Sequence, residues 1–290
     1  MAAANMKAVK LRIKSVQNTM QITKAMQLVA TSKLRKAKEK ADQSRPYFQI
    51  MRETLIDIAK GNTDFQSPYT KQVTNDKWLY IVIAGDRGLA GGYNANLFKF
   101  MENETRGLDY MVLPIGKKSV EYFRQRGVEI MTEEYAEVAK ISVSDCFSVA
   151  RMICDAYSKG KFGHVLLCYT DFVSMMTQTP RSSSLLPLAD FAEEIKDAEE
   201  PAKPVRDLIL YEPDSETVFN AIVPEYLAGL LYTSINVSVA SELAARRTAM
   251  EAATDNAGEM IEKLSLYYNR ARQASITQEI TEIVAGAEGN

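Results

Sequence analysis

The stretch "SELAARRTAMEAATDNAGEMIEKLSLYYNRARQA" (residues 241–274) decides the fold, because apolar and small residues recur in it every seven positions. One series comprises Leu243, Met250, Ala257, Leu264 and Ala271. A second series, three positions later each time, comprises Arg246, Ala253, Met260, Tyr267 and Ala274. Heptads sustained in this way predict a left-handed coiled coil, and alanine in the seam lets two helices approach closely.

The helical pattern around this stretch extends in both directions. It runs from Pro224 to about Ala285, and only Gly229 and Gly258 interrupt it. With a few residues before Pro224, the sequence predicts a C-terminal shaft helix over residues 215–287.

The amino terminus also predicts a long helix, since no glycine precedes Gly61 and no proline precedes Pro46. We expect the helix to end near Pro46 and a second helical piece to follow, so that residues 1–60 form an N-terminal shaft segment. Its apolar residues change face: a first set at Val9, Ile13, Val16 and Met20, a second at Ile22, Met26 and Val29, and a third at Ala30, Leu34, Ala37 and Ala41. This pattern predicts a seam whose register slips.

Two arrangements of these helices remain open. The simpler one is an antiparallel coiled coil of the two chain ends. In the other, each end forms a bundle with the middle of the chain.

The charge of the chain is uneven. Residues 1–45 hold eleven Lys and Arg against Glu39 and Asp42, a net charge of +9, whereas the whole chain carries −2. A segment this basic requires solvent, a polyanion or an acidic protein surface. Tyr47 is the first aromatic residue, so the cations lack the interleaved stacking residues of many nucleic-acid-binding surfaces.

The middle of the chain, residues 76–212, has the sequence pattern of an α/β domain. Predicted strands cover residues 77–85, 110–116, 164–170, 172–180 and 208–214, and predicted helices cover 94–106, 117–126 and 142–159. Strands that alternate with helices indicate a parallel, Rossmann-like sheet. The acidic, proline-punctuated residues 191–207 are expected to form an exposed loop.

A glycine-rich turn offers the main alternative function. In "AGDRGLAGGYN" (84–94), Gly85–Gly92 would follow the first strand, where such turns can hold a phosphate. The spacing is not G-x-G-x-x-G, and Asp86 would place a negative charge beside the phosphate. These two features weaken the phosphate-binding interpretation but do not remove it. A nucleotide-binding enzyme is therefore one alternative function. A nucleic-acid-binding coiled coil is another. "LPIGKKS" (113–119) fails as a P-loop, because Met111 stands where the first glycine is required.

Other residues suggest no catalytic chemistry. Cys146, Cys154 and Cys168 lack metal-ligand spacing and are expected to be reduced thiols. His164, the single histidine, precedes an apolar run and is expected to begin a strand. We find no apolar run near the length of a membrane span and no apolar signal core, and we expect no cofactor and no metal.

Three motifs together resemble the gamma subunit of F-type ATP synthases, over the whole length of the chain. They are "IKSVQNTMQITKAMQLVATSKLRKA" (13–37), "GDRGLAGGYNANLFK" (85–99) and "SELAARRTAMEAATDNAGEMIEKLSLYYNRARQASITQEITEIVAGA" (241–287). The resemblance implies a central rotor shaft without catalytic chemistry, which couples ion flow to ATP synthesis or hydrolysis. The α/β middle would be the foot of this rotor.

The resemblance also implies partners and contact residues. The shaft would stand inside a ring of alpha and beta subunits, one copy per three alpha–beta pairs, and the foot would contact the epsilon subunit and the c ring. Expected ring contacts are Met26, Lys33, Arg35, Arg246, Gln273, Thr277, Glu279, Ile280, Ile283 and Val284. Expected foot contacts are Leu210, Tyr211 and Glu212. No nucleic acid and no direct membrane insertion are implied.

The resemblance implies a place in the cell as well. A chain that starts at Met1 without a transit peptide resembles the bacterial form, so we expect a peripheral protein at the cytoplasmic face of the cell membrane. The sequence also departs from many relatives, since Ala90 stands where they have a cysteine.

Overall fold

The computed structural model describes residues 2–60, 66–70, 75–188 and 211–288. The chain divides into two compact units. The first comprises Met1–Ser32 with Arg246–Asn290, and the second comprises Lys33–Ala245. We call them the helical unit and the α/β unit. The division into segments 1–60, 76–212 and 215–287 stays a prediction about domains.

Two long helices contribute to both units. Helix α1 covers Ala2–Lys60 and helix α6 covers Ser215–Glu288, with Pro46 inside α1 and Pro224 inside α6. The predicted helix end near Pro46 was therefore wrong. Proline removes one backbone hydrogen bond. Beyond Pro46, however, Leu55 and Ile58 are fully buried, and this burial stabilises the continued helix.

Within the helical unit, α1 and α6 contact each other through a narrow seam. The hydroxyl groups of Thr23 and Thr254 are 2.7 Å apart, which fixes their relative register. On α1 the seam side chains are buried or half-buried and alternate in steps of four and three: Val9, Ile13, Val16, Met20, Thr23, Gln27 and Ala30. The predicted slip in register was wrong, because Thr23 and Gln27 occupy seam positions that a count of apolar residues overlooks.

The seam of α6 also differs in part from the prediction. Met250 and Ala257 are buried and Leu264 and Ala271 are half-buried, as the first heptad series predicts. The second series was wrong by one position from Met260 onward, whereas its earlier members Arg246 and Ala253 are half-buried. Its members Met260 and Tyr267 are 45% and 50% exposed. The side chains that follow the first series by four positions are half-buried instead: Thr254, Ile261, Tyr268 and Ser275.

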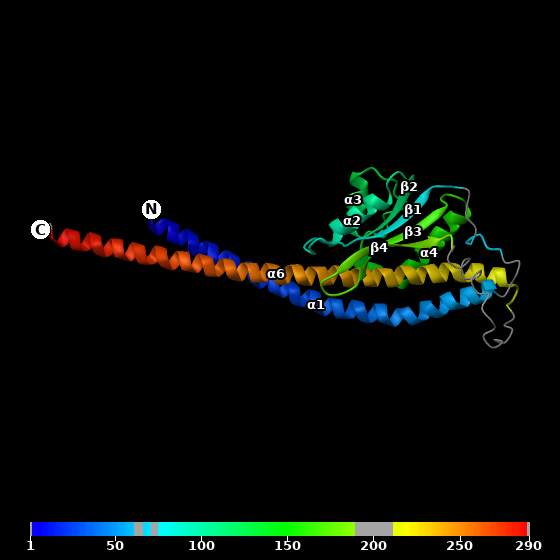
Figure 1. Cartoon of the computed structure of the whole chain (residues 1–290), viewed down its shortest axis with the longest axis horizontal. Coiled ribbons are helices and arrows are strands. Elements are labelled where there is room, and N and C mark those ends of the chain that lie inside the picture. Colours follow the sequence, from blue (N-terminus) through cyan, green and yellow to red (C-terminus); the bar gives the residue numbers. More distant parts are fainter. Residues whose placement is uncertain (1, 61–65, 71–74, 189–210, 289–290) are drawn as a thin grey trace. The chain divides into compact units, whose positions relative to one another are not determined.

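Within the α/β unit, the same two helices lie side by side and antiparallel (Figure 1). The Ser44 and Thr233 hydroxyl groups are 3.1 Å apart. Farther along α1, Phe48 packs against Gly229, where an added Cβ would lie 1.6 Å from the phenylalanine ring. Within the α/β unit, the first buried residues of α1 are Leu34, Ala37 and Ala41.

A mixed four-stranded sheet forms the centre of the α/β unit. Its strands are β1 (Trp78–Ile83), β2 (Tyr110–Ile115), β3 (His164–Phe172) and β4 (Gln178–Leu186), in the order β2-β1-β3-β4. The first three strands are parallel, in the register Trp78↔Tyr110 and Trp78↔His164, and β4 is antiparallel to β3.

The sheet confirms three predicted strands and corrects two. Residues 77–85, 110–116 and 164–170 contain β1, β2 and most of β3, and His164 begins β3. The predicted strand over 172–180 was misplaced, since it covers the end of β3, a turn and the start of β4. The sheet is consequently not purely parallel. Of the predicted strand over 208–214, residues 208–210 lie outside the described residues, and residues 211–214 are irregular.

The three predicted helices of this unit are confirmed. They are α2 (Tyr93–Glu104), α3 (Lys117–Gln125) and α4 (Val143–Ser158), with the short η1 (Val138–Lys140) before α4. A capping box starts α4: the Ser142 hydroxyl accepts from the Asp145 amide, and the Asp145 carboxylate accepts from the Ser142 amide.

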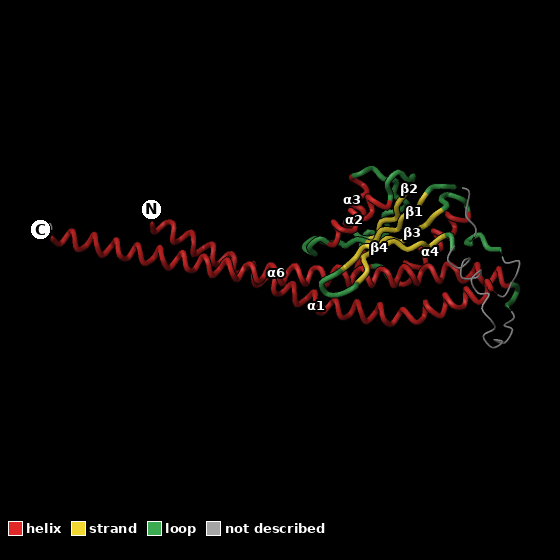
Figure 2. Tube along the Cα trace, in the orientation of Figure 1, coloured by secondary structure: helices red, strands yellow, loops and turns green. Residues whose placement is uncertain are grey.

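Helices cover both faces of the sheet (Figure 2). Alternate strand residues explain the layers, because successive side chains point to opposite faces. Leu79, Ile81 and Ile83 belong to the larger core, with α4 and the sheet-covering parts of α1 and α6. Tyr80 and Val82 belong to a smaller core with α2 and α3. The α/β unit is therefore a three-layer structure.

One 18-residue window within α6 reaches a mean hydropathy of 1.2, which by length and composition alone would suffice to cross a membrane. The sequence prediction had found no such run. Half of this window is buried inside the structure. In α6, Phe219, Val223 and Leu227 are fully buried in the core of the α/β unit, which accounts for apolar residues in this helix.

Candidate partner-binding surfaces

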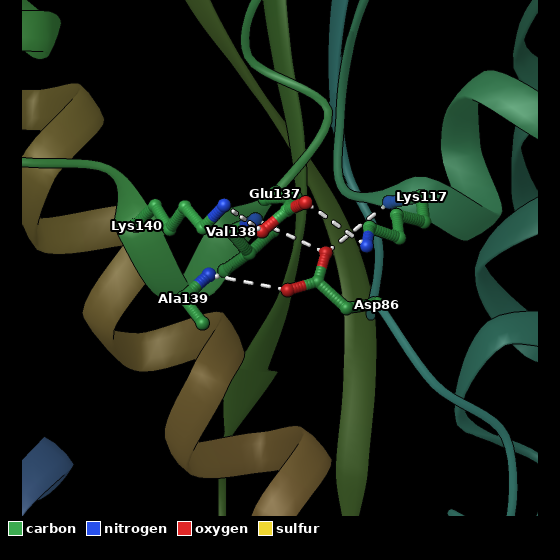
Figure 3. Close-up of polar contacts among 6 residues, drawn as sticks. All are labelled: Asp86, Lys117, Glu137, Val138, Ala139 and Lys140. Atoms are coloured by element: carbon green, nitrogen blue, oxygen red, sulfur yellow. Dashed lines mark hydrogen bonds and ion pairs between the residues drawn. The ribbon is translucent and has the colours of Figure 1, made fainter.

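In the glycine-rich turn after β1, the carboxylate of Asp86 occupies the backbone amides that a phosphate would need. Asp86 accepts hydrogen bonds from three backbone amides (Figure 3). One carboxylate oxygen accepts from Lys117 at 3.2 Å and from Val138 at 3.0 Å, and the other accepts from Ala139 at 3.2 Å. Converging amides beside a helix amino terminus are the groups that would hold a phosphate. Here a side chain of the protein occupies them.

Two lysines near Asp86 are also paired with an acid. Glu137 pairs with Lys117 at 3.0 Å and with Lys140 at 2.8 Å (Figure 3). The hydrogen bond from Lys140, and next that from Lys117, lowers the pKa of Glu137 below its ordinary value. Gly116 has φ = +96°, and an added Cβ would lie 2.1 Å from the Ala84 carbonyl oxygen. The glycine at position 116 thus allows a close backbone contact. Because Asp86 already occupies the converging amides, the nucleotide-binding alternative is not favoured.

Buried polar contacts tie the same edge of the sheet to α6. The Tyr93 hydroxyl donates to the carbonyl and hydroxyl oxygens of Ser238, both at 3.2 Å, and the Thr170 amide donates to the Ser238 hydroxyl at 3.1 Å. A Cβ at Gly85 would lie 2.8 Å from the carboxylate carbon of Glu242, which is only 8% exposed. The hydrogen bonds to Ser238 connect α2 and β3 to α6, and the backbone at Gly85 approaches Glu242 closely.

Two exposed apolar features at this edge of the sheet escaped the sequence analysis. Leu89 is 66% exposed and has φ = +63°, in the left-handed region that non-glycine residues rarely adopt. Val173 and Met176, in the turn between β3 and β4, are 55% and 79% exposed. The available signal was the apolar composition of residues 172–180, which we interpreted as a strand.

The predicted ring contacts on α1 lie in both units. In the helical unit Met26 is half-buried. In the α/β unit Lys33 and Arg35 are exposed, and Arg35 is 3.7 Å from Glu39 in an exposed ion pair of the same helix. The cations predicted from composition are therefore available at the surface.

The predicted ring contacts on α6 all belong to the helical unit. Arg246 is half-buried, and the other side chains are exposed: Gln273, Thr277, Glu279, Ile280, Ile283 and Val284. Within this set the Thr277 hydroxyl donates to the Gln273 carbonyl at 2.9 Å. Ile280 and Ile283 are 56% and 71% exposed, although both are large and apolar. Exposed apolar residues gathered on one helix are typical of an interface.

The predicted foot contacts are described only in part. Tyr211 is half-buried and packs against the larger core, and Glu212 is exposed. Leu210 lies outside the described residues.

The three cysteines and His164 have structural surroundings. Cys146, Cys154 and Cys168 are free and buried, and burial raises the pKa of the first two thiols to about 12. Protonated thiols are poor nucleophiles. His164 stacks on Trp78 with ring centroids 4.2 Å apart. In the described part of the chain, no three His, Cys, Asp or Glu residues are grouped so that they could hold a metal.

Comparison with known proteins assigns the chain to a family. A family model described as ATP synthase matches residues 5–289, so the chain belongs to this family. A protein of Ruminococcus albus named ATP synthase gamma chain is 48% identical, over 97% of this chain and 96% of its own length. A protein of Acetobacterium woodii named ATP synthase gamma chain, sodium ion specific, is 40% identical, over 99% of both chains.

A solved structure has the same fold. A chain in the Euglena gracilis mitochondrial ATP synthase matches with a TM-score of 0.68 and 18% identity, covering 99% of this chain and 95% of that chain. At this identity the likeness concerns the fold. It includes long terminal helices and a central mixed α/β sheet.

Proposed function

We propose that this chain is the central-stalk rotor subunit of an F-type ATP synthase, coupling ion flow mechanically to ATP synthesis or hydrolysis. In this role the chain transmits rotation and supplies no catalytic group for ATP synthesis or hydrolysis. The observation that carries the proposal is the narrow seam between α1 and α6. It pairs the two helices while leaving cations and apolar side chains on the outside.

Such a surface suits a part that turns past several equivalent partners. A rotor must dissociate from each partner subunit as readily as it binds that subunit. A wide apolar interface with one partner would hold the rotor in one position. Exposed ion pairs contribute only about 0–1 kcal/mol each, and they can form and break in succession. The cations Lys33 and Arg35 would meet acidic loops of the ring in this way.

The partners proposed for the chain follow the family to which it belongs. The ring would consist of alpha and beta subunits, three of each around one copy of this chain. Met26, Arg246, Gln273, Thr277 and Glu279 would contact the ring, and Ile280, Ile283 and Val284 would form the tip of the shaft. Leu210, Tyr211 and Glu212 would contact the c ring or the epsilon subunit.

The proposed location follows from these partners. The chain would act as a peripheral part of a membrane-associated complex, at the cytoplasmic face of the cell membrane. The apolar window of α6 would stay in the protein core and not enter the bilayer, because half of it is already buried there.

Assembly provides the test of this proposal. The chain is expressed with the alpha and beta subunits of its organism, and native mass spectrometry counts the copies in the purified complex. We expect one copy per three alpha–beta pairs. Failure to join the complex, or a different ratio, would overturn the proposal.

A matched pair of double variants tests the cationic contact. Replacing Lys33 and Arg35 by alanine should weaken assembly and reduce its salt dependence, because two exposed cations are lost. Replacing Lys159 and Lys161 by alanine removes the same charge from an exposed place after α4. If both double variants assemble alike at low salt, Lys33 and Arg35 do not contact the ring.

A further inference from the structure

The crevice between β1 and β3 lies where the winding of the sheet changes direction. From β1 the chain crosses to β2 on one side, and β3 pairs with β1 on the other side. In open α/β sheets, ligands bind in such a crevice, outside the carboxyl ends of the strands. Here α6 approaches the crevice, since a Cβ added to Gly85 after β1 would lie 2.8 Å from the carboxylate carbon of Glu242.

Ser238 is the residue of α6 that makes hydrogen bonds in this crevice. Thr170 lies beyond Cys168, the last residue of β3 that pairs with β1, and its amide donates to the Ser238 hydroxyl at 3.1 Å. From the start of α2, the Tyr93 hydroxyl donates to the carbonyl and hydroxyl oxygens of Ser238, both at 3.2 Å. One residue of α6 thus accepts hydrogen bonds from two separate elements of the α/β unit.

The contact is polar although it is buried. Thr170, Ser238 and Ser241 are 2%, 1% and 0% exposed. The hydroxyl groups of Thr170 and Ser241 have no hydrogen-bond partner in the part of the chain that the structure describes. Such groups cost free energy when they are buried, so apolar side chains would stabilise this contact more. Polar groups kept in a buried contact can instead specify one alignment of the elements that meet there.

The neighbouring contacts of α6 are of a different kind. Leu227, Leu231 and Ile235 of α6 are buried in the larger core. Apolar burial is non-directional, whereas a hydrogen bond requires a particular distance and angle. A small rotation of α6 about its own axis would therefore preserve most of the apolar burial and break the hydrogen bonds at Ser238.

We propose that Ser238 is a positioning residue that fixes the rotational setting of α6 against the sheet. A twisting force on the sheet then passes to α6 through the hydrogen bonds from Tyr93 and Thr170. This inference rests on the proposed function, in which the chain is a rotor. The crevice that holds a ligand in other sheets of this kind serves here as the attachment site of a helix of the same chain.

The angular fluctuations of a bead test the proposal in the complex with alpha and beta subunits. The ring is held on a surface and kept from turning by a non-hydrolysable ATP analogue. The bead is attached through Lys159→Cys at an exposed position, and the three native cysteines are buried. Ser238→Ala should raise the variance of the bead angle about twofold, because the directional hydrogen bonds to its hydroxyl are lost.

Two further variants keep the test specific. Tyr93→Phe removes one donor and keeps the ring, so it should raise the variance by a smaller amount, and it still tests the proposal if Ser238→Ala fails to fold. Ser234→Ala is the matched control. Ser234 is also buried, lies one turn earlier on α6 and makes no hydrogen bond to the described residues of the sheet. Its replacement should leave the variance unchanged.

The outcomes separate this inference from the rotor proposal. If the complex contains one copy of the chain per three pairs, but Ser238→Ala and Tyr93→Phe fluctuate like Ser234→Ala, the inference is wrong and the rotor proposal stands. A lower Tm of these variants with an unchanged variance would likewise overturn the inference, because the contact would then serve stability alone. If the unmodified chain fails to join the complex, the rotor proposal and this inference are both overturned.

Discussion

The helical unit and the α/β unit bury their side chains in different ways. In the α/β unit the fully buried residues include large aromatic side chains such as Tyr80, Phe123 and Phe219. Among the residues of the helical unit whose side chains the structure describes, the buried ones are Thr23, Ala30, Met250 and Ala257, in a single seam. Large apolar residues there, such as Leu28 and Ile283, are 64% and 71% exposed.

This difference separates two uses of apolar surface. A wide core fixes the α/β unit internally and gives it its stability. A narrow seam is enough to set the register of two helices, and it leaves most of their circumference for other proteins. Substitutions can test this contrast, and the largest effect is expected where a core side chain is removed.

Removing a large side chain should affect the two units very differently. Phe219→Ala leaves a cavity in the core of the α/β unit, and should lower its free energy of unfolding by about 3–5 kcal/mol. Ile280→Ala removes an exposed side chain from the helical unit, and should change the free energy by no more than about 0.5 kcal/mol. Urea titration followed by the fluorescence of Trp78 measures the first, and hydrogen exchange of α6 peptides measures the second. Comparable losses would contradict the contrast.

Gly229 and Gly258, both in α6, should respond to alanine with opposite signs. Gly229→Ala places a methyl group 1.6 Å from an atom of the Phe48 ring, and should destabilise the chain by about 1–3 kcal/mol. At Gly258 no atom beyond the adjoining backbone of α6 lies within 4 Å of an added Cβ, so Gly258→Ala should stabilise the helix by about 0.5–1 kcal/mol. Thermal unfolding followed by circular dichroism compares them. In a Phe48→Ala background the loss at Gly229 should disappear; its persistence would show that the ring is not the cause.

Adjacent residues can establish which face of α6 forms the seam. Ile261 is half-buried and Met260 is 45% exposed, so an aspartate should be tolerated only at position 260. Ile261→Asp should cost about 1–3 kcal/mol, because a charge enters an apolar contact. Hydrogen exchange across residues 246–288 measures the local stability. Greater loss from Met260→Asp would restore the seam predicted from the sequence.

The capping box of α4 should add a small pH dependence. Hydrogen bonds from the Ser142 amide and hydroxyl lower the pKa of Asp145 below 3.8 in the folded chain. Since the folded pKa lies below the unfolded one, the stabilisation is complete above about pH 4 and is lost as the pH falls through the folded value. Asp145→Asn should flatten acid unfolding in this range relative to Asp155→Asn, an exposed acid of the same helix. An unchanged acid profile would contradict the cap.

Much of the fold could be predicted because its signals are repetitive. The first heptad series of α6, three strands and three helices were placed correctly from apolar periodicity. Errors in the seam arose in part where polar residues do the packing. Thr23, Gln27 and Thr254 fill seam positions, and a search for apolar residues passes over them.

The surfaces were less predictable than the fold for a related reason. Apolar residues in a sequence are normally interpreted as buried, so Met176 in a turn and Leu89 in a left-handed conformation gave no signal. The positions of the predicted ring contacts came from resemblance to a family, and the exposure of Gln273 and Ile280 agrees with an interface without testing it. Asp86 was correctly identified as an obstacle to phosphate binding, but the three amides that it occupies come from segments far along the chain.

The most direct test concerns whether α1 and α6 turn as one body inside the ring. Cysteines replace Thr23 and Thr254, whose hydroxyl groups are 2.7 Å apart, and a bead attached to the α/β unit reports rotation in a surface-held complex supplied with ATP. We expect rotation in one direction to continue after the two helices are joined by a disulfide bond. Rotation that stops on oxidation and resumes on reduction would contradict the account, because the helices would then have to move against each other.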